Sequence, residues 1–405
     1  MGHRDAPRRV RAGLLHRPGS RVLMTTTTTT TTELHLDAVR RLFDAEIERG
    51  IETGVQLSVS YRGQVVDLAV GENGAGHPMT TDTFVPWTCS SKPLGALAFA
   101  LAWESGAVDL DTPVSKVLPE FTGGGKERVR VRDVLTHTVG MADPVLAVDT
   151  GGTDLGDFAW SDIDALIWAV VCDAPAGPLP GSRMVYNPVT TWYVLDRLLN
   201  ALDGGQSGDS YRSMLRRLGL TATLGIDPAL PEDRQVTVTA SADQEEGLRY
   251  MQLASALPLP GVGVWGAVRD LRVVGEVLLN KGVHQGVPLV GPATVEALTA
   301  THWPGSPDRS ICDTDFPYGL GVMTQPAIFG RRTSVRTFGH AGGNTSTLLV
   351  DPLFDLVVAV YWNGRLDDVK TFARRYALVR ALYDDLGLPR LPRAGRQPAS
   401  SQQPE

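Results

Sequence analysis

The sequence has few cysteines and no recognisable metal-binding pattern. Its 405 residues include three cysteines, Cys89, Cys172 and Cys312, and eight scattered histidines. An odd number of cysteines spread through a long chain does not make a disulfide framework, which favours a reducing compartment. Neither CxxC nor HxxxH spacing occurs, so the sequence predicts no metal site and no other cofactor.

Long apolar runs and basic stripes are also missing. No run approaches the roughly 18 apolar residues of a membrane span, and the Arg-rich N-terminus lacks the apolar segment of a secretory signal. A formal net charge of −7 and a pI near 5.7 argue against nucleic acid as a partner. We therefore expect a cytoplasmic protein that acts on small molecules, without a nucleic-acid or membrane partner. Oligomeric state leaves no signal in the sequence.

Most of the chain has an ordinary globular composition, with 42% hydrophobic and 20% charged residues. The two ends differ: eight threonines follow Met24, and residues 391–405 are rich in Pro, Ser and Gln. Such segments bury too little apolar surface to offset their ordering entropy. We expect a disordered extension at 1–33 and a disordered tail at 391–405 around a single catalytic domain at 34–390. Translation could begin at Met1 or at Met24.

Hydrophobic spacing predicts an α/β (α+β) fold whose two ends form one sheet. A helix is expected at 36–49, and a hairpin at 55–71 that turns at Arg62-Gly63. Three short β-rich runs between 334 and 364 should add strands, and a helix should follow them. The simplest arrangement is one antiparallel sheet covered by the terminal helices. One face of the last helix is expected to carry Val369, Phe372, Tyr376, Val379 and Tyr383.

The middle of the chain reads differently from its ends. Residues 90–315 contain several helical stretches separated by Gly/Pro-rich loops, and no internal repeat. This pattern predicts a mostly helical subdomain inserted into an α/β part made of residues 34–90 and 316–390.

Residues 83–106, TFVPWTCSSKPLGALAFALAWESG, hold a thiol and an amine one helical turn apart. Cys89 precedes Lys92 by three residues, so a helix starting there carries both side chains on one face. In S-x-x-K sites this spacing lets the lysine deprotonate or polarise the nucleophile. Ser90 and Ser91 point away from Lys92 on such a helix. Taken alone, the same residues would be an ordinary helix start with capping serines and a surface lysine.

Four other segments agree with a catalytic interpretation: VRVRDVLTHTVGM, PGSRMVYNPVTTWYVLDRLL, PGVGVWGAVRDLRVVGEVLLNKG and YGLGV followed by FGHAGGNTSTLLVDP. In this order, over residues 36–385, the chain resembles the serine β-lactamase-related family. That family includes class C β-lactamases, esterases, D-aminopeptidases, penicillin-binding proteins and natural-product transacylases. The resemblance implies a β-lactamase/transpeptidase-like fold.

The resemblance also implies a set of catalytic residues. The nucleophile would be Cys89, its partner Lys92, and the tyrosine of the Y-x-N element Tyr186, although Tyr186 could also be a core tyrosine. His137 is expected to be structural, because the corresponding loop of the family packs rather than catalyses. Cys172 and Cys312 would then be buried thiols without a role.

A further set would bind the substrate. The H-x-G strand of the family would begin at His340 and end at Gly342, and the oxyanion hole would use the backbone N–H groups of the nucleophile and of Gly343. His340 could contact substrate or be a polar strand residue. Trp87 could be a pocket wall or a core tryptophan.

The chain departs from the family at two positions. Pro188 stands where the family has the asparagine of Y-x-N, which argues against β-lactamase activity unless Asn187 substitutes for it. The nucleophile is cysteine and not serine, so the site is either dead or a thiol site. Beside an intact Lys92 and Tyr186, the sulfur analogue of serine favours a thiol site.

A thiol at a helix start beside a lysine should lose its proton readily, and its acyl-enzyme would be a thioester. Thioesters react with amines, relative to water, more readily than oxygen esters. We therefore expect a transacylase that moves an acyl group from an ester or thioester to an amine or hydroxyl without ATP, in natural-product (antibiotic) biosynthesis. The alternatives are an esterase or amide hydrolase of the same family, and an inactive binding or sensing protein. The identities of donor and acceptor cannot be read from the sequence.

Overall fold

A computed structural model describes four segments of the chain: 34–145, 158–240, 244–305 and 315–391. The predicted disordered extension, nearly all of the predicted tail and Cys312 lie outside the described residues. Residues from Leu34 onward group into one compact unit. Among the helices that are described, none combines the length and the hydrophobicity needed to span a membrane.

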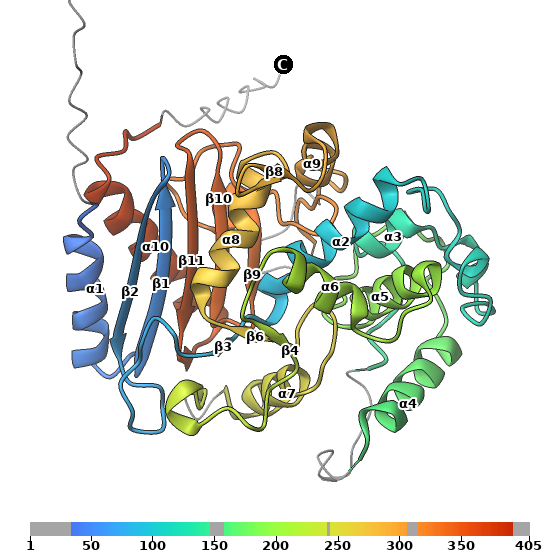
Figure 1. Ribbon diagram of the computed structural model, residues 1–405, viewed down its shortest axis with the longest axis horizontal. Helices are drawn as coiled ribbons and strands as arrows, with labels where there is room; N and C mark the ends of the chain where they lie inside the picture. The colour runs from blue at the N-terminus through green and yellow to red at the C-terminus, as the bar shows by residue number, and fades with distance from the viewer. Residues whose placement is uncertain (1–33, 146–157, 241–243, 306–314, 392–405) are drawn as a thin grey trace, which may run out of the picture. The chain divides into compact units, whose positions relative to one another are not determined.

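The centre of the fold is a five-stranded sheet in the order β2-β1-β11-β10-β9, with every neighbouring pair antiparallel (Figure 1). The first two strands come from the start of the chain and the other three from its end. The predicted joining of the two ends into one antiparallel sheet is therefore confirmed. The strands are β1 (Gly54–Tyr61), β2 (Gln64–Gly71), β9 (Phe338–Gly342), β10 (Ser346–Asp351) and β11 (Leu356–Trp362).

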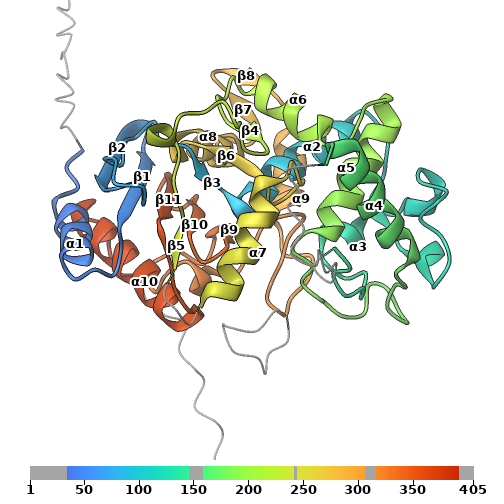
Figure 2. The same cartoon turned by 90° about the horizontal axis from the view of Figure 1, so that it is seen from below.

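Strand β11 is apolar on both faces because both faces of the sheet are covered. One face packs on α1 (Asp37–Glu48) and α10 (Asp368–Asp385), and the other on α8 (Val268–Leu279), as Figure 2 shows. Alternate residues of β11 accordingly belong to two separate clusters: Leu356, Val358, Val360 and Trp362 to the first, and Val357, Ala359 and Tyr361 to the second.

Helix α8 corrects the predicted division of the chain. Its residues fall inside 90–315, which was expected to form a separate helical part, yet the helix lies along the sheet. Gly275 makes this close approach possible, since an added Cβ would lie 2.6 Å from Val357 Cγ1. The sequence could not reveal this contact because α8 and its partner strands are far apart along the chain.

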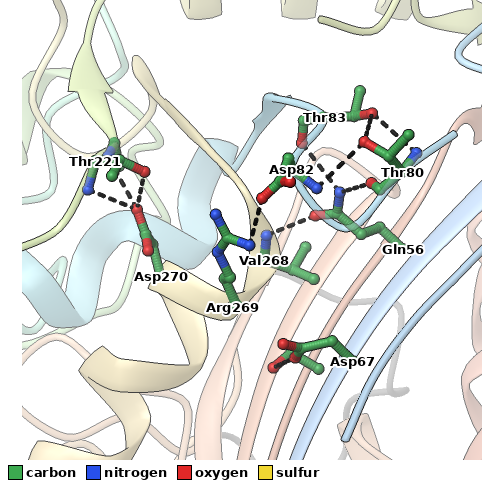
Figure 3. Close-up of polar contacts among 11 residues, drawn as sticks. Gln56, Asp67, Thr80, Asp82, Thr83, Thr221, Val268, Arg269 and Asp270 are labelled. Carbon is green, nitrogen blue, oxygen red and sulfur yellow. Dashed lines mark hydrogen bonds and ion pairs between the residues drawn. The ribbon is translucent and has the colours of Figure 1, made fainter. Parts of the chain in front are cut away.

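Polar contacts fix the first turn of α8 (Figure 3). Gln56 of β1 accepts the backbone N–H of Val268 at 2.6 Å and donates to the carbonyl of Thr83 at 3.0 Å. Asp270 accepts the backbone N–H of Thr221 at 2.8 Å. The Gln56 contact satisfies one of the backbone donors that a helix start leaves without a partner. Helix α8 is thus tied to the sheet through Gln56 and to the neighbouring loop through Asp270.

The predicted face of α10 is confirmed in part: Val379 and Tyr383 are buried, but two other residues of the helix differ from the expected pattern. Val369 is 73% exposed, whereas Arg374 is only 4% exposed. Arg374 is buried because it pairs with Glu52, which is itself 3% exposed and precedes β1. A partner 322 residues away is not visible in the local spacing of apolar residues.

The remaining helices lie mostly to one side of the sheet, where the mostly helical part was expected (Figure 1). A small sheet, β3-β6-β4, connects them to the chain before the Cys-Lys segment. The helices are α2 (Lys92–Glu104), α3 (Val131–Leu135), α4 (Trp160–Asp173), α5 (Thr190–Asp203), α6 (Asp209–Arg217), α7 (Glu245–Ala256) and α9 (Pro292–Thr299). The short strands are β3 (Val85–Pro86), β4 (Thr223–Leu224), β5 (Thr239–Ala240), β6 (Val264–Gly266), β7 (Val283–His284), β8 (Val287–Pro288) and β12 (Gly364–Arg365).

Candidate active site

Cys89 lies in a single 3₁₀ turn, η1 (Thr88–Ser91), that leads directly into α2. The residue before it, Thr88, has φ of 45°, a left-handed conformation that a β-branched residue adopts only under strain. Pro93 in the first turn of α2 favours the helix start at Lys92. The cysteine is half-buried, so the strained turn leaves its thiol within reach of solvent.

The two serines beside Cys89 are structural. Ser90 donates to the carbonyl of His340 at 3.2 Å and contacts Ser346 Oγ at 2.9 Å, which ties the turn to β9 and β10. Ser91 donates to the carbonyl of Thr88 at 2.8 Å. Both serines are 0% exposed. The prediction that neither serine points toward Lys92 agrees with these contacts.

Lys92 is fully buried at 0% exposed, and its ammonium group has no carboxylate in hydrogen-bond contact among the described residues. Its Nζ donates to the carbonyl of Pro188 at 2.7 Å and to the carbonyl of Gly261 at 3.0 Å. Burial lowers the pKa of Lys92, and a hydrogen bond and charge interaction with Cys89 partly oppose this.

This environment suits both protonation states of the lysine. A neutral amine has two N–H groups and one lone pair, so with both N–H groups on carbonyls the lone pair is left for the Cys89 thiol. After proton transfer, the third N–H faces the thiolate. Lys92 can therefore exchange a proton with Cys89 without moving, and its lowered pKa makes the amine form accessible.

Tyr186 lies on the loop before α5 and faces the same lysine. Lys92 Nζ is 5.7 Å from the centroid of the Tyr186 ring and 5.8 Å from that of Trp192. The Tyr186 side chain is half-buried, and its ring is 4.5 Å from that of His137. Cys89, Lys92 and Tyr186 are thus brought together, as their spacing and the resemblance predicted.

The end of β9 passes directly over the nucleophile turn. A Cβ added to Gly342 would lie 2.7 Å from the backbone nitrogen of Cys89 and 2.2 Å from Thr88 Oγ1, so only glycine fits. Gly343, with φ of 54°, then turns the chain away. Gly342 and Gly343 therefore place backbone next to the N–H of Cys89, where the resemblance expects an oxyanion hole.

His340 is a buried strand residue whose two ring nitrogens are both used. Nδ1 donates to the carbonyl of Ala341 at 2.8 Å, which leaves Nε2 to accept from the hydroxyl of Tyr318 at 2.9 Å. Burial, and then the charge of Lys92, hold the pKa of His340 well below its usual value. The side chain is 0% exposed. This burial favours the interpretation of His340 as a polar strand residue over its interpretation as a substrate contact.

Two other expected substrate residues lie away from solvent. Trp87 is 0% exposed and donates its indole N–H to the carbonyl of Gly266 at 3.0 Å, which places it in the core and not in a pocket wall. Asn187 is 1% exposed, and its side-chain oxygen accepts the backbone N–H of Thr191 at 3.3 Å. Whether it replaces the asparagine of Y-x-N stays a prediction.

Sequence reasoning missed three contributors to the site. Trp192 lies over Lys92, Tyr318 holds His340, and Asp143 caps the start of α5 by accepting from the backbone N–H of Val189 at 2.8 Å. Tyr318 falls in the YGLGV segment and Trp192 in the TTWY segment, so both were inside recognised motifs. Asp143 had no motif to mark it. In the described ranges, no group of three or more His, Cys, Asp or Glu could hold a metal ion.

Comparison with known proteins places this geometry in a family. A family model described as Beta-lactamase matches residues 39–382. The chain belongs to the Beta-lactamase family. Among curated relatives, a putative D-alanyl-D-alanine carboxypeptidase from Salmonella agona (strain SL483) is 24% identical over 333 residues, which cover 72% of each protein.

Solved structures agree with the Beta-lactamase fold. A penicillin-binding protein homolog from Caulobacter crescentus has a TM-score of 0.67 and 24% identity, covering 87% of this chain and 99% of that one. EstCE1, a hydrolase with promiscuous acyltransferase activity, has a TM-score of 0.69 and 19% identity, covering 86% of this chain and 98% of that one. The predicted β-lactamase/transpeptidase-like fold is therefore confirmed.

Proposed function

We propose that this Beta-lactamase family member is a transacylase that carries the acyl group on Cys89. The observation that supports it best is the pairing of a half-buried thiol with a fully buried lysine that hydrogen-bonds two carbonyls and Cys89. A thiol needs only a weak base, and a lysine of lowered pKa is a suitable one. EstCE1 shares the fold and is described as having promiscuous acyltransferase activity, which is compatible with acyl transfer on this scaffold.

In the first half-reaction, Lys92 takes the thiol proton and the sulfur attacks the acyl carbon of an ester or thioester. A C–S bond forms, and the carbonyl oxygen becomes an oxyanion that the backbone N–H groups of Cys89 and Gly343 stabilise. Each such donor contributes roughly 3 kcal/mol in other enzymes. The tetrahedral intermediate then expels the alcohol or thiol, which takes a proton delivered by Lys92 or Tyr186. The enzyme is left as a thioester.

In the second half-reaction an amine or hydroxyl acceptor attacks the thioester. Its proton passes to Lys92, the new C–N or C–O bond forms, and the C–S bond breaks to return the thiolate. No ATP is consumed, because the thioester keeps the reactivity of the donor. The thiol must stay reduced, so the proposal includes a reducing, cytoplasmic setting and natural-product assembly as the context.

The second candidate is hydrolysis of esters or small amides through the same thioester. The relatives named as carboxypeptidases and esterases favour it. The two candidates share every step except the last, in which water replaces the acceptor. A protein that only binds ligand in the cleft would not form the thioester at all.

Intact-protein mass spectrometry tests the proposal. The protein is incubated with a panel of activated esters and thioesters, and we expect one acyl adduct whose mass identifies the preferred donor. Cys172 provides an internal control, because burial raises the pKa of its thiol and should keep it unacylated. Peptide mapping should place the adduct on Cys89, and the Cys89→Ala variant should carry none. An adduct that persists in Cys89→Ala, or no adduct with any donor, would contradict the proposal.

A further inference from the structure

His137 lies beside the reacting groups but has no role in the scheme above. It follows α3, is 0% exposed and has φ of 57°, a left-handed conformation uncommon for a residue with a side chain. Strained residues of this kind persist only where the surroundings over-determine them, and they cluster at functional sites. The question is what this strained, buried imidazole holds in place.

The residues on both sides of Tyr186 are bonded to His137. The backbone N–H of Val185 donates to the His137 carbonyl at 2.9 Å, and the backbone N–H of Asn187 donates to His137 Nδ1 at 3.2 Å. One residue thus holds the chain immediately before and immediately after the tyrosine. The backbone on either side of Tyr186 therefore cannot shift without breaking at least one of these bonds.

The imidazole ring of His137 also packs against the phenol ring of Tyr186. The ring centroids of His137 and Tyr186 are 4.5 Å apart, with planes inclined by 40°. On its other sides the imidazole meets the ring of Tyr318 at 5.1 Å and the indole N–H of Trp192, whose Nε1 is 3.3 Å from Nε2. His137 is therefore fixed by its own neighbours while it fixes Tyr186.

The surroundings keep the imidazole neutral. A neutral ring carries one proton, and of the groups that face its two nitrogens, only the hydroxyl of Thr191, 3.1 Å from Nδ1, can accept it. A second ring proton would have no acceptor among these partners. Burial, and then the charge of Lys92, hold the pKa of His137 well below its usual value. A neutral ring next to Lys92 adds no charge that would compete with the proton exchange between Lys92 and Cys89.

We infer that His137 is a positioning residue, which holds the hydroxyl of Tyr186 where the leaving group of the acyl donor departs. This inference rests on the proposed function and deepens it. His137 affects the reaction through Tyr186. A general packing role would instead act on the whole fold, and the two roles give different results in a double-mutant cycle.

The cycle combines His137→Gly with Tyr186→Phe. Glycine removes the imidazole while accepting the left-handed backbone, so the loop is not strained by the substitution itself. We expect His137→Gly to slow Cys89 acylation by about 30- to 100-fold with the KM for the donor changed less than about threefold, because a displaced catalytic group costs rate more than binding. In the Tyr186→Phe background, the same substitution should have an effect of no more than about threefold.

Two variants complete the cycle. His137→Asn keeps a residue that tolerates left-handed backbone and offers an amide oxygen near the position of Nδ1, so it should recover about tenfold of the lost rate. His302→Gly, at an exposed histidine outside the site, is the control for loss of an imidazole as such. Equal effects of His137→Gly with and without the Tyr186 hydroxyl would overturn the inference.

A readout that needs no activity separates this inference from the proposed function. Fluorotyrosine placed at position 186 should give one sharp ¹⁹F resonance in the wild-type protein, and His137→Gly should broaden it and move it toward the frequency of free fluorotyrosine. An unchanged resonance would show that Tyr186 is held by other groups. A wild-type protein whose Cys89 cannot be acylated would contradict the proposed function, while the ¹⁹F spectra would still decide the role of His137.

Discussion

Two buried cations, one on α10 and one at the start of α2, differ in the groups that accompany them. Arg374 of α10 is 4% exposed and pairs with Glu52, whose second oxygen accepts the backbone N–H of Gly364 at 2.9 Å. Lys92 at the start of α2 is 0% exposed, and its hydrogen bonds among the described residues go to two backbone carbonyls and to Cys89. The nearby charge of Asp143 raises the pKa of Lys92, but less than burial lowers it. Arg374 thus has a permanent counter-charge, whereas Lys92 can give up its proton.

The comparison separates a charge that builds the fold from a charge that can change during a reaction. The two regions still meet at one turn, because Arg374 also donates to the carbonyl of Asn344, next to Gly343. Asn344 donates to the carbonyl of Leu366 at 3.1 Å as well. Arg374 therefore stabilises the backbone at Gly343 and Asn344, next to the oxyanion hole proposed for the reaction in which Lys92 takes part.

The largest difference between the two cations should appear in activity. Replacing Lys92 by Met removes the base and fills a similar volume, so we expect acylation of Cys89 to fall by about 10³-fold. Stability should be unchanged or higher, because the variant no longer buries a charge without a carboxylate. Stopped-flow acylation rates and thermal melts measure the two effects. A strongly destabilised variant that keeps its acylation rate would make Lys92 a structural residue like Arg374.

The turn between the two regions should be the next most sensitive element. In Gly342→Ala the new Cβ would meet the backbone nitrogen of Cys89 and the side chain of Thr88, so the strand and the nucleophile turn must separate. We expect a loss of about 10²-fold in kcat, the cost of a misplaced oxyanion donor. Gly205→Ala is a suitable control, since Gly205, like Gly342, does not have a left-handed φ, and its added Cβ would make only ordinary contacts, the nearest at 3.4 Å. Full activity in Gly342→Ala would remove Gly342 from the site.

Arg374→Met should reverse the outcome expected for Lys92. Removing one member of a buried ion pair leaves Glu52 without its counter-charge, at a cost of about 3–5 kcal/mol in the free energy of unfolding. Residual activity at low temperature should fall less than about tenfold, since the reacting groups remain. Urea unfolding measures the stability, and adding Glu52→Gln should restore part of it. An Arg374→Met variant as stable as the wild type would mean that the pair does not hold the fold.

A smaller, pH-dependent effect is expected beside the same pair. Burial, and then the charge of Glu52, raise the pKa of Glu46 from 4.5 to about 7. Between these values the folded protein keeps a proton that the unfolded chain has lost, so stability should fall as the pH rises from 4.5 to 7 and level off above. The contribution of Glu46 is at most about 3 kcal/mol. Urea unfolding of the wild type and of Glu46→Gln at pH 5 and pH 8 measures it, and equal slopes in both proteins would refute the assignment.

Much of the fold follows from local pattern. Alternation and turn residues located all five strands of the main sheet, and helical spacing located α1 and α10, because each depends on neighbours in sequence. The burial of Arg374 on α10 could not be found this way, since Arg374 is polar and its partner Glu52 is distant. The contact of α8 with β11 was hidden for the same reason.

The candidate site was predictable to a similar extent. The i, i+3 spacing alone predicted that Cys89 and Lys92 share one face of a helix. The resemblance to the family added Tyr186, Gly342 and Gly343. The position of Trp87 in the core and the bond from Tyr318 to Nε2 of His340 depend on partners more than 20 residues away. The left-handed φ of Thr88 has no signature in the sequence either.

The central claim is that the sulfur of Cys89 directs the acyl group to an acceptor and not to water. The most direct measurement is the ratio of amide to carboxylic acid products at one fixed amine concentration, for the wild type and for Cys89→Ser. The serine variant keeps Lys92 and Tyr186 but forms an oxygen ester, so the account predicts slower turnover and a lower amide-to-acid ratio than in the wild type. An equal or higher ratio in Cys89→Ser would show that the pocket, and not the thioester, selects the acceptor, and would contradict the account.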